Sequence, residues 1–391
     1  MFFAMIFLTI KNISNSSGQL LLISILCLWP FFQGCKEHRV EPLQNIQFVE
    51  ENIIDIARFE LSTLELEATE ESYLHGVSQF LNYGNLFFIL DNVQSKKINI
   101  YDESGKYIKQ LGSNGRGPGE YVQPWSISID RNNHRIAVLD VGQNIVLYYD
   151  LDDFSFIRAD HIPFNATKME FLGKGNIGWY GSQTENAYIL ITDSLNNIIQ
   201  ELIPRNFNPG YIKGSATKNL SASDSMVLFY TPHSPILYDI NADSAKLKHH
   251  VSFENFDFPS ISELTNFKEN NDDYINYIKE NSYIQFCDFY DTPTNLYCNF
   301  FVDKKMYFGF YDKSNNRAIY HSKDKLMEFL KIPQFFNPVG VLKDFLICRI
   351  NNVDVLKNYE AGAVHNKQID KELRAIEEDS GFVMLLIKFN D

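Results

Sequence analysis

Short apolar runs separated by turn residues recur along most of the chain. Residues 124–161 are the clearest case, since the runs PWSISID, HRIAVLD, NIVLYYD and SFIRADH follow one another with only a few residues between them. Runs of this length, rich in Val, Ile, Tyr and Phe and bounded by Asp, Asn and Gly, are typical of strands joined by tight turns. The pattern predicts one antiparallel sheet of four strands.

The same unit recurs with a period of about 40–50 residues. Asp91 and Asp102 in the segment 85–111 correspond to Asp140 and Asp150 in the next unit. Looser copies contain Asp193, Asp239 and Asp312, and the last copy ends in the run 382–389. Repeats of this length with four strands each are the signature of a β-propeller. We therefore expect an all-β fold, a six-bladed β-propeller of four-stranded antiparallel blades.

Three segments do not fit the repeat. Residues 261–282 and 366–380 are charged and have helical spacing, so they are expected to be short helical insertions on loops. The alternating segment 59–68 has no blade of its own. We expect it to supply the outermost strand of the last blade, beside 382–389, because this pairing joins the termini and removes a sheet edge. Residues 59–391 then form a single propeller.

The N-terminal residues 1–34 have the pattern of a signal peptide. The apolar run Leu20–Phe32 is too short for a comfortable membrane span and is followed by Gly34, Cys35 and a charged stretch. A small residue before a cysteine at this point is typical of a bacterial lipobox, so Cys35 is the expected lipidation site. The alternative is an ordinary buried cysteine. Residues 35–58 are expected to be a linker that tethers the propeller to the membrane.

Composition narrows the classes of partner. Of the 391 residues, 45% are hydrophobic and 14% aromatic, which is ample for a packed core, and the formal net charge is −14. An acidic chain repels phosphate backbones, so nucleic acid is not an expected partner. The cysteine and histidine spacings match no metal site, and we expect neither metal nor cofactor. Cys287 and Cys298 form a disulfide or remain buried free thiols.

The glycine-rich stretch Gly112–Tyr121 raises the question of phosphate binding. Pro118 and Gly119 stand where a phosphate-binding loop has Lys and Ser or Thr, and Pro124 leads into a strand rather than a helix. The stretch is therefore interpreted as a loop between two blades. Its ligand-binding candidates are Arg116, Glu120, Tyr121 and Trp125. For Arg116 and Glu120, a local ion pair that stiffens the loop is the expected arrangement, and ligand contact is the alternative.

A family resemblance rests on the same region. Tyr101–Gly112 reads YDESGKYIKQLG and is followed by GRGPGEY, with Pro124 next, an order that resembles NHL-type blades. Together with Cys35, the chain resembles the TolB-like six-bladed β-propeller lipoproteins of Gram-negative envelopes. The likeness is tight over residues 85–160 and architectural elsewhere. It implies a fold and an envelope location, and little about chemistry.

The expected function is non-catalytic binding. The protein is interpreted as an exported, lipid-anchored and monomeric binding or scaffold propeller, in a leaflet that the sequence does not identify. Its partner is an envelope protein or a small-molecule or carbohydrate ligand held around the central channel. One alternative is a lyase or hydrolase acting on a carbohydrate or peptide there, for which no catalytic residue stands out. Another is a structural subunit of a membrane complex.

Overall fold

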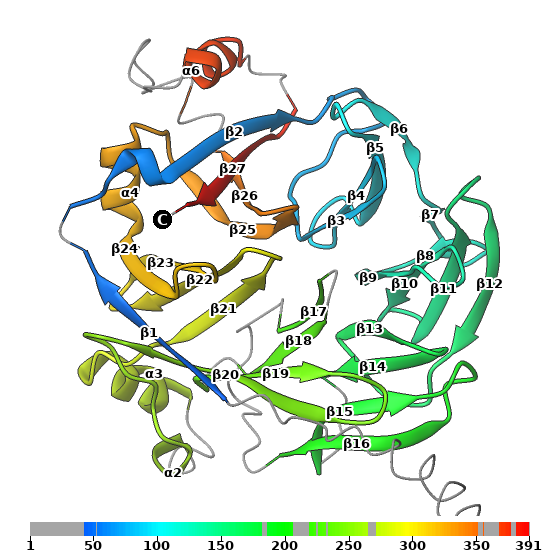
Figure 1. Ribbon diagram of the computed structural model, residues 1–391. Coiled ribbons are helices and arrows are strands. Elements are labelled where there is room, and N and C mark those ends of the chain that lie inside the picture. The colour runs from blue at the N-terminus through cyan, green and yellow to red at the C-terminus, as the bar shows by residue number, and fades with distance from the viewer. Residues whose placement is uncertain are drawn as a thin grey trace, which may run out of the picture. The chain divides into compact units, whose positions relative to one another are not determined.

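Six four-stranded antiparallel blades are arranged around a central axis (Figure 1), which confirms the predicted fold. The computed structural model describes residues 43–390, apart from 52, 182–185, 206–218, 224–225, 232–233, 265–270, 351–354, 356–366 and 377–380. The expected signal peptide, residues 1–34, and Cys35 lie outside the described residues.

In the first five blades the innermost strand comes first along the chain, whereas in the sixth the outermost strand comes first. The first three blades are β3 (Gln79–Tyr83), β4 (Leu86–Asp91), β5 (Lys97–Asp102) and β6 (Tyr107–Gln110); β9 (Pro124–Asp130), β10 (Arg135–Asp140), β11 (Ile145–Asp150) and β12 (Phe156–His161); and β13 (Lys168–Gly173), β14 (Asn176–Tyr180), β15 (Ala187–Thr192) and β16 (Ile198–Pro204). The last three are β17 (Leu220–Ala222), β18 (Val227–Tyr230), β19 (Ile236–Ile240) and β20 (Ala245–Phe253); β21 (Phe286–Asp291), β22 (Asn295–Val302), β23 (Lys305–Asp312) and β24 (Arg317–Ser322); and β25 (Phe335–Leu342), β26 (Phe345–Ile350), β27 (Val383–Phe389) and β2 (Phe59–Glu65).

The two middle strands of a blade are buried on both faces, because each blade packs between two neighbours. In β10 and β11 nearly every residue is buried, whereas the outer strand β12 is mostly exposed. Middle strands therefore read as continuous apolar runs, and one hydrophobic cluster lies between each pair of adjacent blades.

A side-chain oxygen closes the turn between the third and fourth strands in the first five blades. Each accepts backbone N–H groups two or more residues ahead, which fixes the turn. These residues are Asp102, Asp150, Asp193, Asn241 and Asp312. The repeated position of the fourth blade is therefore Asn241 and not Asp239, which lies within β19.

The N-terminal strand β2 closes the ring, as the sequence predicted. It pairs antiparallel with β27 from Phe59 opposite Phe389 to Glu65 opposite Val383. The backbone N–H of Leu66 donates to the carbonyl of Phe382 at 2.9 Å. A Cβ on Gly381 would lie only 1.6 Å from the Leu66 carbonyl oxygen, so this contact requires glycine.

Strand β1 (Gln44–Glu50) corrects the expectation that residues 35–58 are only a linker. It pairs parallel with β20 and then with β24, so it joins the fourth and fifth blades into one nine-stranded sheet. Phe48 is fully buried and stacks on Phe253 with ring centroids 5.1 Å apart. The close approach depends on Gly309, whose Cβ would lie 2.9 Å from the Phe48 ring.

Short helices lie between strands. Helices α2 (Ile261–Leu264) and α3 (Asn271–Glu280) fall in the first predicted insertion, and α6 (Lys367–Arg374) falls in the second. The 3-10 helix η2 (Ile56–Arg58) and helix α4 (Lys323–Leu330) were not predicted; the hydroxyl of Ser322 caps α4. No helix of the described chain has the length and apolar composition needed to cross a bilayer.

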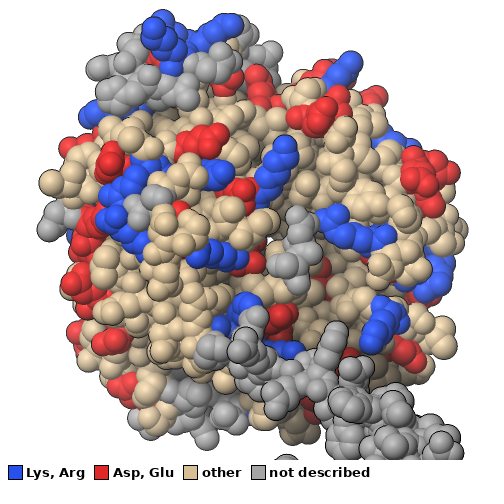
Figure 2. Space-filling view, viewed as in Figure 1, with Lys and Arg blue, Asp and Glu red and all other residues tan. Residues whose placement is uncertain are grey.

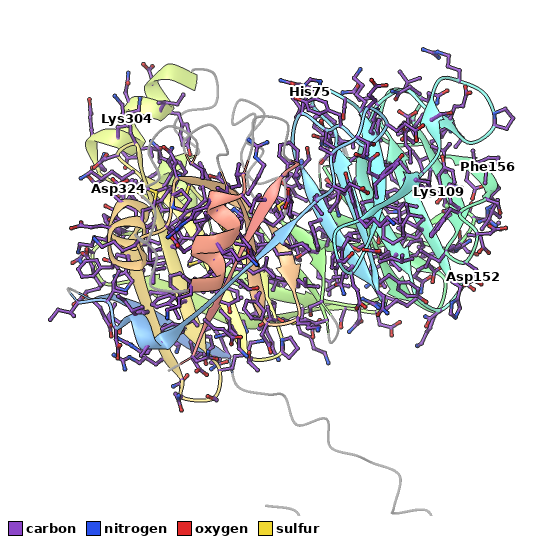
Figure 3. All side chains as sticks on the ribbon, turned by 90° about the horizontal axis from the view of Figure 1, so that it is seen from above. His75, Lys109, Asp152, Phe156, Lys304 and Asp324 are labelled. Atoms are coloured by element: carbon purple, nitrogen blue, oxygen red, sulfur yellow. The ribbon has the colours of Figure 1, made fainter. Side chains whose placement is uncertain are left out.

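The ring has two faces, which the side view separates (Figure 3). The crossover face carries the loops between blades and the turns between second and third strands, with His75 and Lys304 on it. The hairpin face carries the other turns, including Asp152 in the turn between β11 and β12.

We expect Phe48→Ala to lower the free energy of unfolding by about 3–5 kcal/mol, since it leaves a large cavity between two blades. Gln47→Ala on the exposed side of the same strand should change it by less than about 0.5 kcal/mol. Urea denaturation of both variants checks this. Equal losses would show that β1 is held by its backbone pairing alone.

Candidate functional site

The central channel is lined by all six innermost strands. A cavity of about 140 Å³ lies inside it, and each of the strands β3, β9, β13, β17, β21 and β25 contributes side chains to its wall. Most of the wall is apolar, with Phe80, Phe289 and Val339 among its residues. Five charged residues also line it: Lys168 and Glu170 within the channel, and Arg131, Asp291 and Lys343 toward the hairpin face.

Lys168 and Glu170 lie two residues apart on β13, so both point to the same side of the strand. The two residues are 7% and 5% exposed, and Lys168 is the only buried Lys or Arg among the described residues. The Ser128 hydroxyl donates to Glu170 Oε2 at 2.7 Å. The described residues supply no hydrogen bond or close ion pair to the Lys168 ammonium; Glu170 and Asp288 act on it only through longer-range charge.

Burial moves both groups toward neutrality. It lowers the pKa of Lys168 to about 8, although the charges of Glu170 and Asp288 oppose this shift. It raises the pKa of Glu170 to about 7, against the Ser128 hydrogen bond and the charge of Lys168. An amine with a pKa of about 8 beside an acid with a pKa of about 7, both inside a cavity, is an arrangement typical of a functional site.

Asp288 on β21 is a second buried carboxylate beside the channel. Its Oδ1 accepts from the hydroxyl of Tyr230 on β18 at 2.9 Å. Burial, together with the negative charge of Asp288, raises the pKa of Tyr230 well above its ordinary value. Tyr230 therefore stays protonated and holds Asp288 in place.

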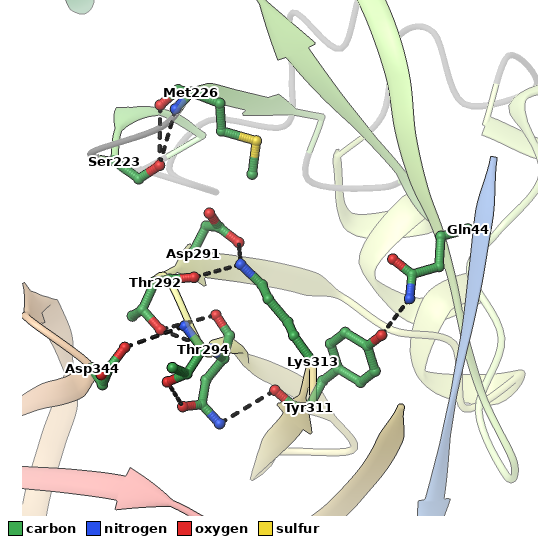
Figure 4. A network of polar contacts seen from close by, with 10 residues as sticks. Gln44, Ser223, Met226, Asp291, Thr292, Thr294, Tyr311, Lys313 and Asp344 are labelled. Atoms are coloured by element: carbon green, nitrogen blue, oxygen red, sulfur yellow. Dashed lines mark hydrogen bonds and ion pairs between the residues drawn. The ribbon is translucent and has the colours of Figure 1, made fainter. Parts of the chain in front are cut away.

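Basic side chains surround the channel on the hairpin face. Arg131 and Lys343 line the cavity there and are exposed, and Lys313 Nζ lies 2.7 Å from Asp291 Oδ1 (Figure 4). Burial raises the pKa of Asp291, while Lys313 opposes this shift. Figure 2 shows this face, with Lys and Arg around the central hollow and acidic groups both beside the hollow and nearer the rim.

The crossover face has its own opening into the channel. A cavity of about 330 Å³ lies there, lined by Trp125 and Val77 and by two cations, Lys168 and Arg349. No Asp or Glu belongs to the described lining of this cavity. Lys168 lines both cavities, so it can be reached from either face.

The four predicted ligand-binding residues do not converge. Tyr121 is fully buried in the core between the first two blades, and its hydroxyl donates to the Leu111 carbonyl, so it has no surface for a ligand. Trp125 alone lines the channel opening. Arg116 and Glu120 belong to the loop that carries β7 (Ser113–Asn114) and β8 (Glu120–Tyr121).

That loop packs against the outer edge of the second blade rather than the channel. Gly119 lies against Phe156 of the outer strand β12, and its carbonyl accepts from Tyr149. The expected ion pair between Arg116 and Glu120 is not formed. Glu120 instead accepts from the backbone N–H of Gly117 at 2.7 Å, and Arg116 is exposed.

Two further expectations concern metal and sulfur. Cys287 and Cys298 are buried free thiols, so the alternative of a disulfide is not realised in this structure. Within the part of the chain that is described, no three His, Cys, Asp or Glu side chains are placed to hold a metal ion.

Lys168 and Glu170 were not predicted as site residues, because the strand that carries them, β13, was not recognised in the sequence. The segment KMEFLG follows the turn residues Pro163 and Asn165, but it is short and carries two charges, and the third repeat was read from its second strand onward. The sequence feature that could have identified them is a Lys and a Glu at alternate positions of the innermost strand of a blade. In a propeller these positions face the axis, where a charge is buried.

Comparison with protein families and solved structures agrees with the architecture. A family model described as DUF5128, 6-bladed beta-propeller, matches residues 36–349. Among curated proteins there is no match.

Two solved structures resemble the chain along most of its length. A Bacteroides fragilis protein described as a candidate exported protein is 25% identical, with a TM-score of 0.83 over 89% of this chain and 100% of that one. A Bacteroides vulgatus member of the DUF4221 family is 11% identical, with a TM-score of 0.52 over 85% and 99% of the two chains. The second likeness shows the fold alone.

The buried acid predicts a pH dependence of stability. Because folding raises the pKa of Glu170 from 4.5 to about 7, the folded state holds its proton more tightly. The resulting stabilisation is complete below pH 4.5 and is lost as the pH rises through about 7, an effect of up to about 3 kcal/mol.

Glu170→Gln, which stays neutral, should therefore gain stability relative to the wild type between pH 4.5 and 7. Denaturation at several pH values measures the difference. A constant difference across this range would contradict the raised pKa.

Proposed function

The chain belongs to the DUF5128 family of six-bladed β-propellers, and we propose that it is a non-catalytic binding protein of the cell envelope whose channel holds a small anionic ligand at Lys168. The unpaired ammonium of Lys168 is the observation that carries this proposal. A buried charge without a close partner is unfavourable, and an anion placed against it would remove that penalty. No described side chain fills this role.

The charge distribution supports an anion rather than a cation. The whole chain carries a formal charge of −14, yet the cavity on the hairpin side is lined by three cations, Arg131, Lys168 and Lys343, against two carboxyl groups, Glu170 and Asp291. Asp291 is already paired with Lys313, and Arg349 lies at the other opening. Many acidic side chains of the hairpin face lie in outer turns, where backbone N–H groups hold them. A basic opening within an acidic surface draws small anions inward.

A second candidate is a lyase or hydrolase that works in the same channel. The pKa values of Lys168 and Glu170, about 8 and about 7, suit proton transfer near neutral pH. Release of product from a carbohydrate or peptide would support this candidate. Saturable binding without turnover supports the first.

The proposed location is the envelope of a Gram-negative bacterium, with Cys35 acylated. The motif around Cys35 and the likeness to a candidate exported protein of Bacteroides fragilis support export. A lipid on Cys35, combined with no membrane-spanning helix in the described residues, would make the protein peripheral.

Cys35→Ser should release the protein from the membrane fraction into the soluble fraction, because the acyl chains supply the attachment. Fractionation of cells after metabolic labelling with a fatty acid checks this. Retention of the variant in the membrane, or absence of label from the wild type, contradicts lipidation at Cys35.

Lys168→Gln should weaken anion binding at least about tenfold, since a charge-assisted hydrogen bond contributes about 1.5–3 kcal/mol. The folded protein should be no less stable, because the change removes a buried charge. Lys174→Gln is the matched control, an exposed lysine in the turn that follows β13.

Thermal shifts and calorimetric titration with acetate, citrate and inorganic phosphate measure the binding. At least one anion should stabilise the wild type and Lys174→Gln but not Lys168→Gln. Absence of binding by all three anions, or equal binding by both variants, contradicts the proposal.

A further inference from the structure

The indole of Trp125 lines the crossover opening and has no partner among the described side chains. It makes no hydrogen bond, ring contact or cation contact with the described residues. Trp179 behaves differently: it is fully buried, its Nε1 donates to Thr192 Oγ1 at 2.9 Å, and its ring packs against Phe164. Trp179 is a core residue, whereas Trp125 presents a polarisable ring and a free N–H donor to the cavity.

Two cations, Arg349 and Lys168, line the same opening as Trp125, and only Arg349 is held by neighbouring groups. Arg349 is held by its neighbours: its guanidinium lies 4.7 Å from the Phe382 ring centroid, and Nη1 donates to the His75 carbonyl at 3.3 Å. Lys168 is more than nine-tenths buried, lines this cavity and has no close partner. One aromatic platform and one free ammonium therefore face the same space, which contains no described carboxylate.

The opening also contains two side-chain amides, Asn92 and Asn337, and amides can hydrogen-bond to the hydroxyl groups of a ligand. Asn337 is exposed, and its amide makes no hydrogen bond with the described residues. Asn92 is fixed by the Ser78 hydroxyl at 2.6 Å, and its Nδ2 donates to the Trp125 carbonyl at 3.4 Å. The exposed Asn337 amide is therefore available to a ligand hydroxyl group.

From this arrangement we infer that the crossover opening binds an acidic monosaccharide, its ring on Trp125 and its carboxylate at Lys168. The volume of about 330 Å³ lies at the lower end of the range for small-molecule sites, about 300–1,000 Å³, which favours a single sugar ring over a longer chain. The inference rests on the proposed function, because it assigns the anionic group of the ligand to the same Lys168.

Titration of the full chain carrying Cys35→Ser with glucuronate, glucose and benzoate tests it, with binding followed by calorimetry and by Trp fluorescence. Glucuronate should bind at least tenfold more tightly than either glucose or benzoate, because only glucuronate offers both the hydroxyl-bearing ring and the carboxylate. Its binding should change the Trp fluorescence.

Trp125→Ala should weaken glucuronate binding at least tenfold, while Trp125→Phe, which keeps a ring, should retain most of it. Lys168→Gln should reduce the affinity to that of glucose. Thermal unfolding of each variant confirms that the fold is intact.

The outcomes separate this inference from the proposed function. If citrate or phosphate binds through Lys168 but glucuronate does not, or if benzoate binds as well as glucuronate, the sugar inference is wrong and the anion site stands. If no anion binds, both are wrong. Glucuronate binding that Trp125→Ala leaves unchanged also overturns the inference.

Discussion

The pairing of β2 with β27 is the interaction on which the rest of the structure depends. Seven residue pairs join a strand near the start of the propeller to the last strand of the chain. Without them the sixth blade would lack its outer strand and the ring would have an open edge. With the ring closed, the six innermost strands face one another, and side chains from distant parts of the sequence meet around the axis. The channel is therefore a consequence of ring closure.

Closure also explains why charged side chains lie at the axis of the ring. Facing innermost strands leave a space at the axis that side chains do not fill, and Lys168 and Glu170 point into it. Ser128 satisfies Glu170, and Tyr230 satisfies Asp288, whereas the Lys168 ammonium has no comparable partner. Burial of such a group opposes folding unless it contributes something else, and binding of an anion is a sufficient reason for its presence.

Much of the architecture was predictable, because it follows from local patterns. Middle strands buried on both faces give apolar runs, and the Asp102 and Asp150 turns mark the period. Strand β1 was missed because its partners β20 and β24 lie some 200 residues or more away and pair in parallel, which leaves no hairpin signal. Of the residues around the channel, Trp125 was named from its place after the glycine-rich loop, and it lines the crossover opening. Lys168 was not named, since only the assembled ring shows that its ammonium is buried and unpaired.

The pKa of Lys168, measured in the free and the anion-loaded protein, tests the central claim most directly. NMR of protein labelled at the lysine ε-carbons, with Lys168→Gln used for assignment, follows its titration. We expect a pKa near 8 in the free protein, because burial disfavours the ammonium. We expect it to rise when citrate or phosphate is bound, because an adjacent anion favours the charged form. An ordinary pKa of about 10.4 in the free protein, or a value that bound anion leaves unchanged, would contradict the claim that Lys168 is the anion-binding group of the channel.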